Sequence, residues 1–220
     1  TGDKATSLER WAQSTGHAFL RLDYSGHGES DGAFRDGTLG RWIADAQAVI
    51  AHCAVETAGL GGRLVLVGSS MGGWVMVRLA QIMAQTGGRP QIAGLVGIAA
   101  APDFTEDLMP KRLGADVMAT IARDGLIEMP TPYSDRPYVV TRQLLEDGRH
   151  HLVLRAPVDL AMPVRLLHGT ADRDVPWTQS QKLLERLTGD DVTLTLIRDG
   201  DHRLSTPRDL DRLRHTVETL

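Results

Sequence analysis

The sequence has 220 residues, 42% of them hydrophobic, and a formal net charge of −4. These values are typical of one globular domain with a sizeable core, and they exclude a disordered or fibrous protein. Lysine and arginine are scattered along the chain, which argues against nucleic-acid binding, and no apolar run is long enough to cross a membrane. The single cysteine, Cys53, cannot form an internal disulfide, so we expect a small buried apolar residue in a cytoplasmic protein.

The first hundred residues alternate between helical and strand patterns, which predicts a mostly parallel sheet flanked by helices. We expect helices at 4–15, from the cap residue Thr38 to about 58, and from 74 to about 87, with strands at 17–23, 64–68 and 92–99. A glycine-rich turn, 24–32, follows the first strand. We expect His27 in this turn to be structural.

The most specific motif lies where the second predicted strand meets a helix. Gly68-x-Ser70-x-Gly72 fits the G-x-S-x-G nucleophile elbow, in which small residues on both sides of the serine let strand and helix approach closely and expose its hydroxyl. The strand pattern before the motif and the helical pattern after it supply the required context. The sequence therefore predicts Ser70 as a nucleophile.

The pattern changes between residues 101 and 162, where prolines separate short helical pieces and no strong buried strand is expected. We interpret 101–162 as a small cap insertion between two core segments, 1–100 and 163–220. Its apolar residues either line a substrate pocket or pack the insertion onto the sheet, and the pattern leaves both open. His150 and His151 do not share a helix face and have no cluster of acids or thiols beside them, so we expect no metal site.

Alternation resumes from residue 163 onward. We expect strands at 164–167 and 192–197, a helix ending near 187, a final helix from Pro207, and loops at 168–176 and 198–204. Both loops follow strands, and they hold acidic residues and a histidine.

A serine hydroxyl becomes a good nucleophile when a neutral imidazole takes its proton, and the imidazole needs a carboxylate on its other nitrogen. In hydrolases of this topology the order along the chain is Ser, then Asp or Glu, then His, each after a parallel strand. Asp172 and His202 follow Ser70 in this order. Asp174 is a second choice for the acid, because its chemistry is the same.

Several stretches together resemble the α/β-hydrolase superfamily over nearly the whole chain. They are the elbow Gly-Ser-Ser-Met-Gly-Gly-Trp, the turn Asp-Tyr-Ser-Gly-His-Gly-Glu-Ser, Leu-Leu-His-Gly-Thr-Ala-Asp with Val175-Pro176-Trp177, and Gly200-Asp201-His202-Arg203. They are most similar to the branch of the mitochondrial acyl-protein thioesterase that also cleaves acyl glucuronides, and to its bacterial relatives. The resemblance implies an α/β-hydrolase fold with Ser70 as nucleophile, Asp172 as acid, His202 as base and the peptide N–H of Met71 as half of the oxyanion hole.

The resemblance also implies strands, and a loop that donates the second oxyanion N–H, ahead of the first helix. This chain opens directly at that helix. We therefore expect a missing N-terminal strand region, with a few dozen residues before Thr1 that supply both.

Three classes of function are compatible with these residues. The first is a serine hydrolase that cleaves carboxylic esters or thioesters through an acyl-enzyme and needs no cofactor, its substrate a small-molecule ester, an acyl thioester or an acylated protein. The alternative is a peptidase or amidase on the same fold. A catalytically silent binding protein is disfavoured by the intact triad residues. We expect the insertion to form a lid that sets acyl-chain preference, while the natural substrate and the oligomeric state stay open.

Overall fold

The structure is a computed structural model that describes residues 2–56, 62–87, 90–130 and 137–220. It comprises two compact units, and each is described below by itself. The first unit holds the residues up to Leu22, Ala46–Pro102 and Val153–Leu220, and the second holds Asp23–Asp45 and Asp103–Leu152.

The limits of these units differ from those of the expected insertion. The sequence pattern places residues 23–45 in the core, whereas in the structure they pack with 103–152. Residues 153–162 conversely pack with the first unit. Chain order alone cannot show this division, because it depends on which distant segments come together.

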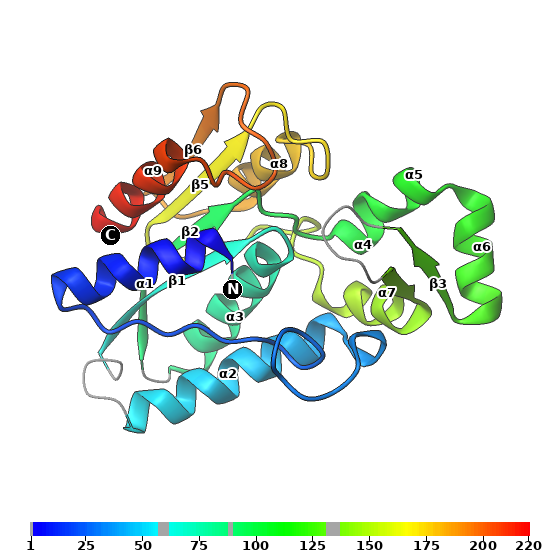
Figure 1. Cartoon of the computed structure of the whole chain (residues 1–220), viewed down its shortest axis with the longest axis horizontal. Helices are drawn as coiled ribbons and strands as arrows, with labels where there is room; N and C mark the ends of the chain where they lie inside the picture. The colour runs from blue at the N-terminus through cyan, green and yellow to red at the C-terminus, as the bar shows by residue number, and fades with distance from the viewer. Residues whose placement is uncertain (1, 57–61, 88–89, 131–136) are drawn as a thin grey trace. The chain divides into compact units, whose positions relative to one another are not determined.

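A four-stranded parallel sheet, in the order β1-β2-β5-β6, forms the centre of the first unit (Figure 1). Its strands are β1 (Arg63–Ser69), β2 (Gln91–Ile98), β5 (Val164–Gly169) and β6 (Val192–Ile197). All three pairings are parallel, so the carboxyl ends of the strands meet at one edge of the sheet. Loops that leave this edge are therefore neighbours in space.

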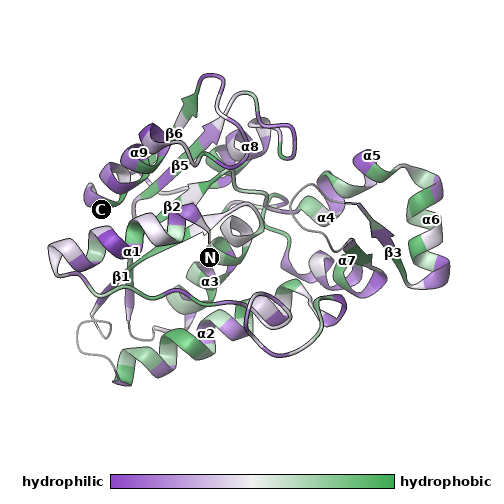
Figure 2. Cartoon of the chain, viewed as in Figure 1, coloured by the Kyte–Doolittle hydropathy of each residue, from purple (hydrophilic) through white to green (hydrophobic). Residues whose placement is uncertain are grey.

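Helices cover both faces of this sheet: α1 (Asp3–Thr15), α3 (Met71–Thr86), α8 (Thr178–Arg186) and α9 (Pro207–Glu218). On one face, α1 and α9 bury apolar side chains against the strands: Leu8, Val96, Ile98, Leu167, Leu204 and Leu213. Figure 2 shows α9 as mainly hydrophilic, so its few apolar residues mark the side that is buried. Burying one such leucine stabilises the fold by roughly 1.5–3 kcal/mol.

Helices α3 and α8 lie on the opposite face of the sheet. The methyl group of Met76 on α3 lies beside Gly97 of β2, and Ser180 on α8 contacts His168 of β5. Because side chains alternate along a strand, His168 shares its face with Leu166 and not with Leu167. Among the described helices, none is both long and apolar enough to cross a membrane.

The expected strand at 17–23 is wrong. Gly16 ends α1 in the left-handed conformation with φ 73°, and the N–H of His17 donates to the carbonyl of Ala12 at 2.9 Å. The chain then runs on without pairing with any of the described strands. A strand needs a neighbouring backbone to complete its hydrogen-bond ladder, so an apolar pattern alone does not make one. The strands expected before Thr1 stay a prediction.

Helix α2 (Leu39–Glu56) begins where the sequence predicts, and the expected end at 57–58 lies outside the described residues. The hydroxyl of Thr38 accepts the N–H of Arg41 at 3.2 Å, as a helix cap does. Cys53 is half-buried and not buried, because the last turn of α2 is solvent-facing and leaves Val55 82% exposed.

The second unit is built from short elements. They are η1 (Phe34–Asp36), α4 (Phe104–Asp107), α5 (Met109–Leu113), α6 (Ala115–Asp124), β3 (Leu126–Met129), β4 (Tyr138–Thr141), α7 (Arg142–Gly148) and η2 (Arg149–His151). β3 and β4 pair antiparallel, and neither is a fully buried strand, which agrees with the expectation of no strong buried strand in this region. Four residues are too few for strand periodicity to separate them from helix in the sequence.

Apolar residues of this unit pack into a cluster of their own around fully buried Ile121. Its members are Met109, Leu113, Val117, Met118, Ile127, Met129, Tyr138, Val140 and Leu145. These apolar residues therefore pack with one another inside the second unit, an arrangement different from the expected packing of the insertion onto the sheet.

The glycine-rich turn 24–32 is held by aromatic contacts inside the second unit. The ring of His27 lies 5.1 Å from that of Phe34 and 5.2 Å from that of Trp42, both in edge-on geometry. The indole N–H of Trp42 donates to the carbonyl of Ser25 at 3.2 Å. Burial, with the charge of Asp45 adding to it, raises the pKa of Tyr24 to about 12. These contacts agree with the structural role expected for His27.

Candidate active site

Ser70 makes the whole turn between strand β1 and helix α3. Its backbone has φ 54° and ψ −120°, an unfavourable conformation for a residue with a Cβ, costing of order 1–3 kcal/mol. Three backbone hydrogen bonds hold it there. The N–H of Ser70 donates to the carbonyl of Ile98 at 2.9 Å, and the carbonyl of Ser70 accepts from the N–H groups of Gly73 at 2.9 Å and Ala101 at 3.0 Å. The neighbouring strand β2 therefore stabilises the strained turn.

The glycines around Ser70 differ in whether a Cβ atom would fit at their position. A Cβ on Gly68 would overlap the carbonyl oxygen of Gly72, and one on Gly73 would lie 2.6 Å from the Cβ of Ala100. A Cβ on Gly72 would have no heavy atom within 4 Å. Close approach of β1 and α3 thus depends on Gly68, and close approach of α3 to the chain just after β2 depends on Gly73. The expectation that the second glycine of the motif is needed for this approach is wrong, because its missing side chain points into open space.

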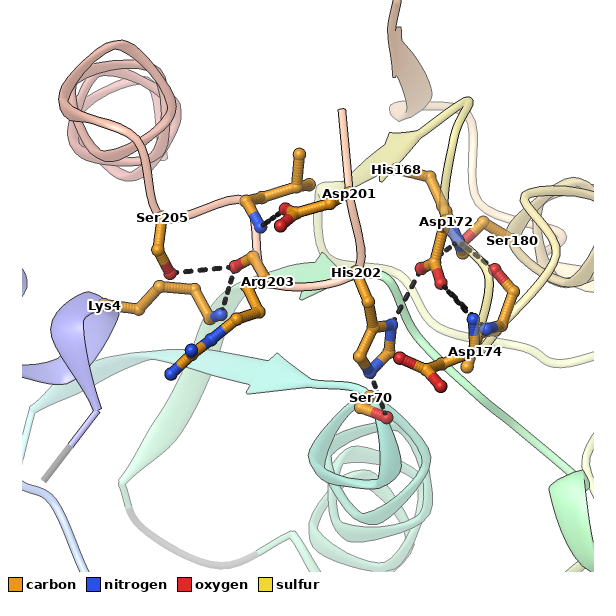
Figure 3. A network of polar contacts seen from close by, with 12 residues as sticks. Lys4, Ser70, His168, Asp172, Asp174, Ser180, Asp201, His202, Arg203 and Ser205 are labelled. Carbon is orange, nitrogen blue, oxygen red and sulfur yellow. Dashed lines mark hydrogen bonds and ion pairs between the residues drawn. The ribbon is translucent and has the colours of Figure 1, made fainter. Parts of the chain in front are cut away.

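The carboxylate of Asp172 lies in the loop after β5, and its side chain is 0% exposed. Its Oδ1 accepts the N–H groups of Asp174 and Val175, both at 2.9 Å. These two bonds orient the carboxylate and leave Oδ2 directed at the ring of His202, whose Nδ1 is 2.8 Å away (Figure 3).

Asp172 is ionised despite its burial. Burial by itself raises the pKa of a carboxyl, but hydrogen bonds from His168, from His202 and from the Val175 N–H outweigh it. Together they hold the pKa of Asp172 well below its usual range. Asp172 therefore keeps its negative charge at neutral pH. This charge can stabilise the His202 ring when that ring is protonated.

His202 lies in the loop after β6 and joins the other two side chains. Its Nε2 is 3.1 Å from the Oγ of Ser70, and its side chain is 18% exposed. Because Asp172 only accepts, Nδ1 carries the proton, and Nε2 is left to accept the serine proton. His202 can therefore take the proton of Ser70 while Ser70 Oγ attacks as a nucleophile.

The acid loop and the histidine loop are bonded to each other by their backbones. The N–H of Thr170 donates to Ile197 and that of Ala171 to Gly200, while the N–H of Asp199 donates to the Thr170 hydroxyl, each at 2.9 Å. These bonds fix the separation of Asp172 and His202 independently of their own contact.

Further contacts shape the histidine loop itself. Asp201 Oδ1 accepts the N–H of Leu204 at 2.9 Å, a bond that holds the shape of this loop. The ammonium group of Lys4, on α1, donates to the carbonyl of Arg203 (Figure 3). Burial, with the charge of Arg203 as a smaller contribution, lowers the pKa of Lys4. Sequence patterns give no sign of this contact, because 199 positions separate its partners.

Met71 is the first residue of α3. The N–H groups of a first helical turn have no acceptor within the helix, and the helix dipole favours negative charge beside them. This position is compatible with the oxyanion role expected for the Met71 N–H, which stays a prediction, as does the second donor.

One group of potential metal ligands occurs in the described ranges: Asp172, Asp174 and His202 offer ligand atoms within 4.8 Å of one another. Both carboxyl oxygens of Asp172 and both ring nitrogens of His202 already take part in the hydrogen bonds given above. This is the arrangement that proton transfer requires. Asp172, and not Asp174, makes the contact with His202 Nδ1, so the geometry favours the first choice of acid.

Comparison with known proteins gives a consistent result. The sequence profile of the family described as "Alpha/beta hydrolase family" matches residues 5–213. The human palmitoyl-protein thioesterase ABHD10, mitochondrial, is 35% identical over 223 residues, covering 100% of this chain and 68% of that protein. The bovine protein of the same name is also 35% identical, with the same coverage.

Two solved structures are similar over nearly the whole chain. The crystal structure of a protein from Agrobacterium vitis S4 has a TM-score of 0.92 and 47% identity, covering 99% of this chain and 82% of its own. Mouse alpha/beta hydrolase domain-containing protein 10 has a TM-score of 0.84 and 32% identity, covering 100% and 83%. The expected fold class and the resemblance seen in the sequence motifs are thereby confirmed.

Proposed function

Because the chain belongs to the α/β-hydrolase family, we propose that it is a serine hydrolase that cleaves thioesters or carboxylic esters through an acyl-enzyme on Ser70. The observation that carries the proposal is the line of contacts from Ser70 Oγ to His202 Nε2 at 3.1 Å and from His202 Nδ1 to Asp172 Oδ2 at 2.8 Å. This is the order of groups that activates a serine hydroxyl.

The reaction has two halves. Ser70 Oγ attacks the acyl carbon and its proton moves to His202 Nε2, while the charge of Asp172 stabilises the imidazolium. The N–H of Met71 stabilises the oxyanion. Collapse breaks the bond to the leaving thiol or alcohol, which takes the proton from His202. A water then attacks the acyl carbon of the acyl-enzyme and gives a proton to His202. The bond from the acyl carbon to Ser70 Oγ breaks, Ser70 takes that proton from His202, and the carboxylic acid leaves.

The substrate class is drawn from the relatives. Proteins named palmitoyl-protein thioesterase match the whole of this chain at 35% identity, which supports a long-chain acyl thioester as the substrate. We propose that acyl-protein or small-molecule thioesters are cleaved faster than the matching oxygen esters and acyl glucuronides. The role expected for the insertion 101–162 in acyl-chain preference stays a prediction. The cytoplasmic location stays a prediction.

A fluorophosphonate probe tests the nucleophile, since it labels activated serines only. Wild-type protein should gain one adduct on Ser70, as located by peptide mass spectrometry, and Ser70→Ala should gain none. Ser69→Ala is the matched control, because it removes the neighbouring hydroxyl at the end of β1. Labelling of Ser70→Ala equal to that of wild type would overturn the assignment.

Matched substrates test the reaction class. Hydrolysis of a palmitoyl thioester, the corresponding p-nitrophenyl ester, an acyl glucuronide and the corresponding anilide is compared at equal concentration. Thioester and ester turnover well above that of the anilide supports the proposal. Preference for the anilide would establish the peptidase or amidase alternative instead.

A further inference from the structure

His168 is a fully buried histidine beside the candidate triad, with 0% of its surface exposed. Its Nδ1 lies 2.7 Å from the hydroxyl of Ser180. Its Nε2 lies 3.0 Å from the carbonyl oxygen of Val175 and 3.2 Å from Oδ2 of Asp172. Both ring nitrogens are thus engaged, one with α8 and the other with the acid loop (Figure 3).

The partners of His168 decide which nitrogen carries its proton. A carbonyl and a carboxylate can only accept, so Nε2 must carry the hydrogen and share it between Val175 and Asp172. In a ring that carries one proton, Nδ1 is then the acceptor for the Ser180 hydroxyl, and the tautomer is the Nε2–H form.

The four hydrogen bonds of Asp172 are therefore complete. Oδ1 accepts two backbone N–H groups, and Oδ2 accepts one N–H from His202 and one from His168. A carboxylate offers about four lone-pair sites, so none is left over. Among the side-chain donors that hold the pKa of Asp172 low, His168 is the largest contributor.

We infer that His168 is a positioning residue of the candidate site: its Nε2–H orients Asp172 and withdraws negative charge from the oxygen that faces His202. This inference rests on the proposed function and goes beyond the triad itself. With the donor present, Oδ2 is a weaker partner for the His202 imidazolium. Without it, the carboxylate turns more easily and holds the proton on His202 more strongly.

Several charged groups surround His202 and would act on it alongside His168. They are Asp172 and Asp174 from the loop after β5, Asp201 and Arg203 from its own loop, and Lys4 from α1. Replacing residue 168 removes none of these groups, so a shift in the pH profile reports the donor that Asp172 has lost.

Two substitutions of similar length separate the donor from mere packing. Gln can place its Nε2–H₂ near the position of the histidine Nε2, so His168→Gln keeps a donor, whereas His168→Met fills similar space without one. We expect His168→Met to move the midpoint of the ascending limb of kcat/KM to higher pH by about one unit and to lower kcat roughly tenfold. His168→Gln should keep the wild-type midpoint and stay within about threefold in kcat.

Equal midpoints for wild type, His168→Met and His168→Gln would overturn the inference, and so would a Gln variant that behaves like the Met variant. If His168→Met does not fold, the inference is tested by the pH midpoint of His168→Gln and by the tautomer of His168 in the wild-type protein. Nitrogen-15 NMR of histidine-labelled wild-type protein should show His168 as the Nε2–H tautomer, and the Nδ1–H tautomer would contradict the inference. An inert wild type that no fluorophosphonate labels would instead be a failure of the proposed function.

Discussion

Gly169 at the end of β5 lies against the carbonyl oxygen of Gly200, so closely that a Cβ atom on Gly169 would overlap it. Gly200 also accepts the N–H of Ala171 at 2.9 Å. The loop that carries Asp172 and the loop that carries His202 are therefore packed backbone to backbone, and the space for this contact exists only because residue 169 has no side chain.

We predict that Gly169→Ala pushes the two loops apart. Overpacking of this kind costs roughly 1–3 kcal/mol, which lowers Tm by several degrees in a chain of this size. Activity should fall by more than Tm suggests, because His202 moves relative to Ser70. Gly62→Ala is the control, since its Cβ would have no neighbour within 4 Å. If Gly169→Ala matched this control in Tm and kcat/KM, the packing argument would be wrong.

The elbow glycines provide a second prediction. Gly68→Ala must displace the backbone of Gly72 and should destabilise the fold by at least 1 kcal/mol, whereas Gly72→Ala meets no atom and replaces a helical glycine by a better helix former. Thermal unfolding of the two variants measures the difference. A Gly72→Ala variant that is destabilised as strongly as Gly68→Ala would show that the second motif glycine has a steric role after all.

The choice of acid can be tested by a pair of conservative substitutions. Asp172→Asn should reduce kcat/KM by about 10³-fold or more, since an amide in this position favours the wrong imidazole tautomer. Asp174→Asn should reduce it by less than tenfold, because the backbone N–H of Asp174, and not its side chain, bonds to Asp172. The reverse ranking would assign the acid to Asp174.

The lowered pKa of Asp172 predicts an acid dependence of stability. In the unfolded chain an aspartate takes up a proton near pH 3.9, but in the folded protein Asp172 does so only at lower pH. The stabilisation is therefore present above about pH 4 and is lost as the pH falls towards the folded pKa. Urea unfolding between pH 2.5 and 6 should show this loss in wild type and a smaller one in Asp172→Asn.

Asp174→Asn serves as the control for this acid dependence and should keep the wild-type slope of unfolding free energy against pH. Identical slopes for wild type and Asp172→Asn would mean that other carboxylates cause the acid unfolding.

The sequence by itself determined the fold class and brought Ser70, Asp172 and His202 together as candidates. Ser70 could be predicted from the sequence because an elbow is a local feature, in which a strand pattern, glycines and a helical pattern follow one another directly. Asp172 and His202 could be predicted because parallel strands place all their carboxyl ends at one edge of the sheet. The order of strands and loops therefore already implies that the three residues are neighbours.

Only the tertiary structure decided what depends on contacts between distant segments. Residues 17–23 form no strand because no described strand pairs with them, and Gly72 is sterically dispensable because its missing side chain faces open space. His168 lies beside Asp172 because side chains alternate along β5 and turn this ring towards α8, and the acceptors Val175 and Asp172 fix which ring nitrogen carries the hydrogen. Pairing, free space and side-chain direction are properties of neighbours in space, and the linear order of residues does not contain them.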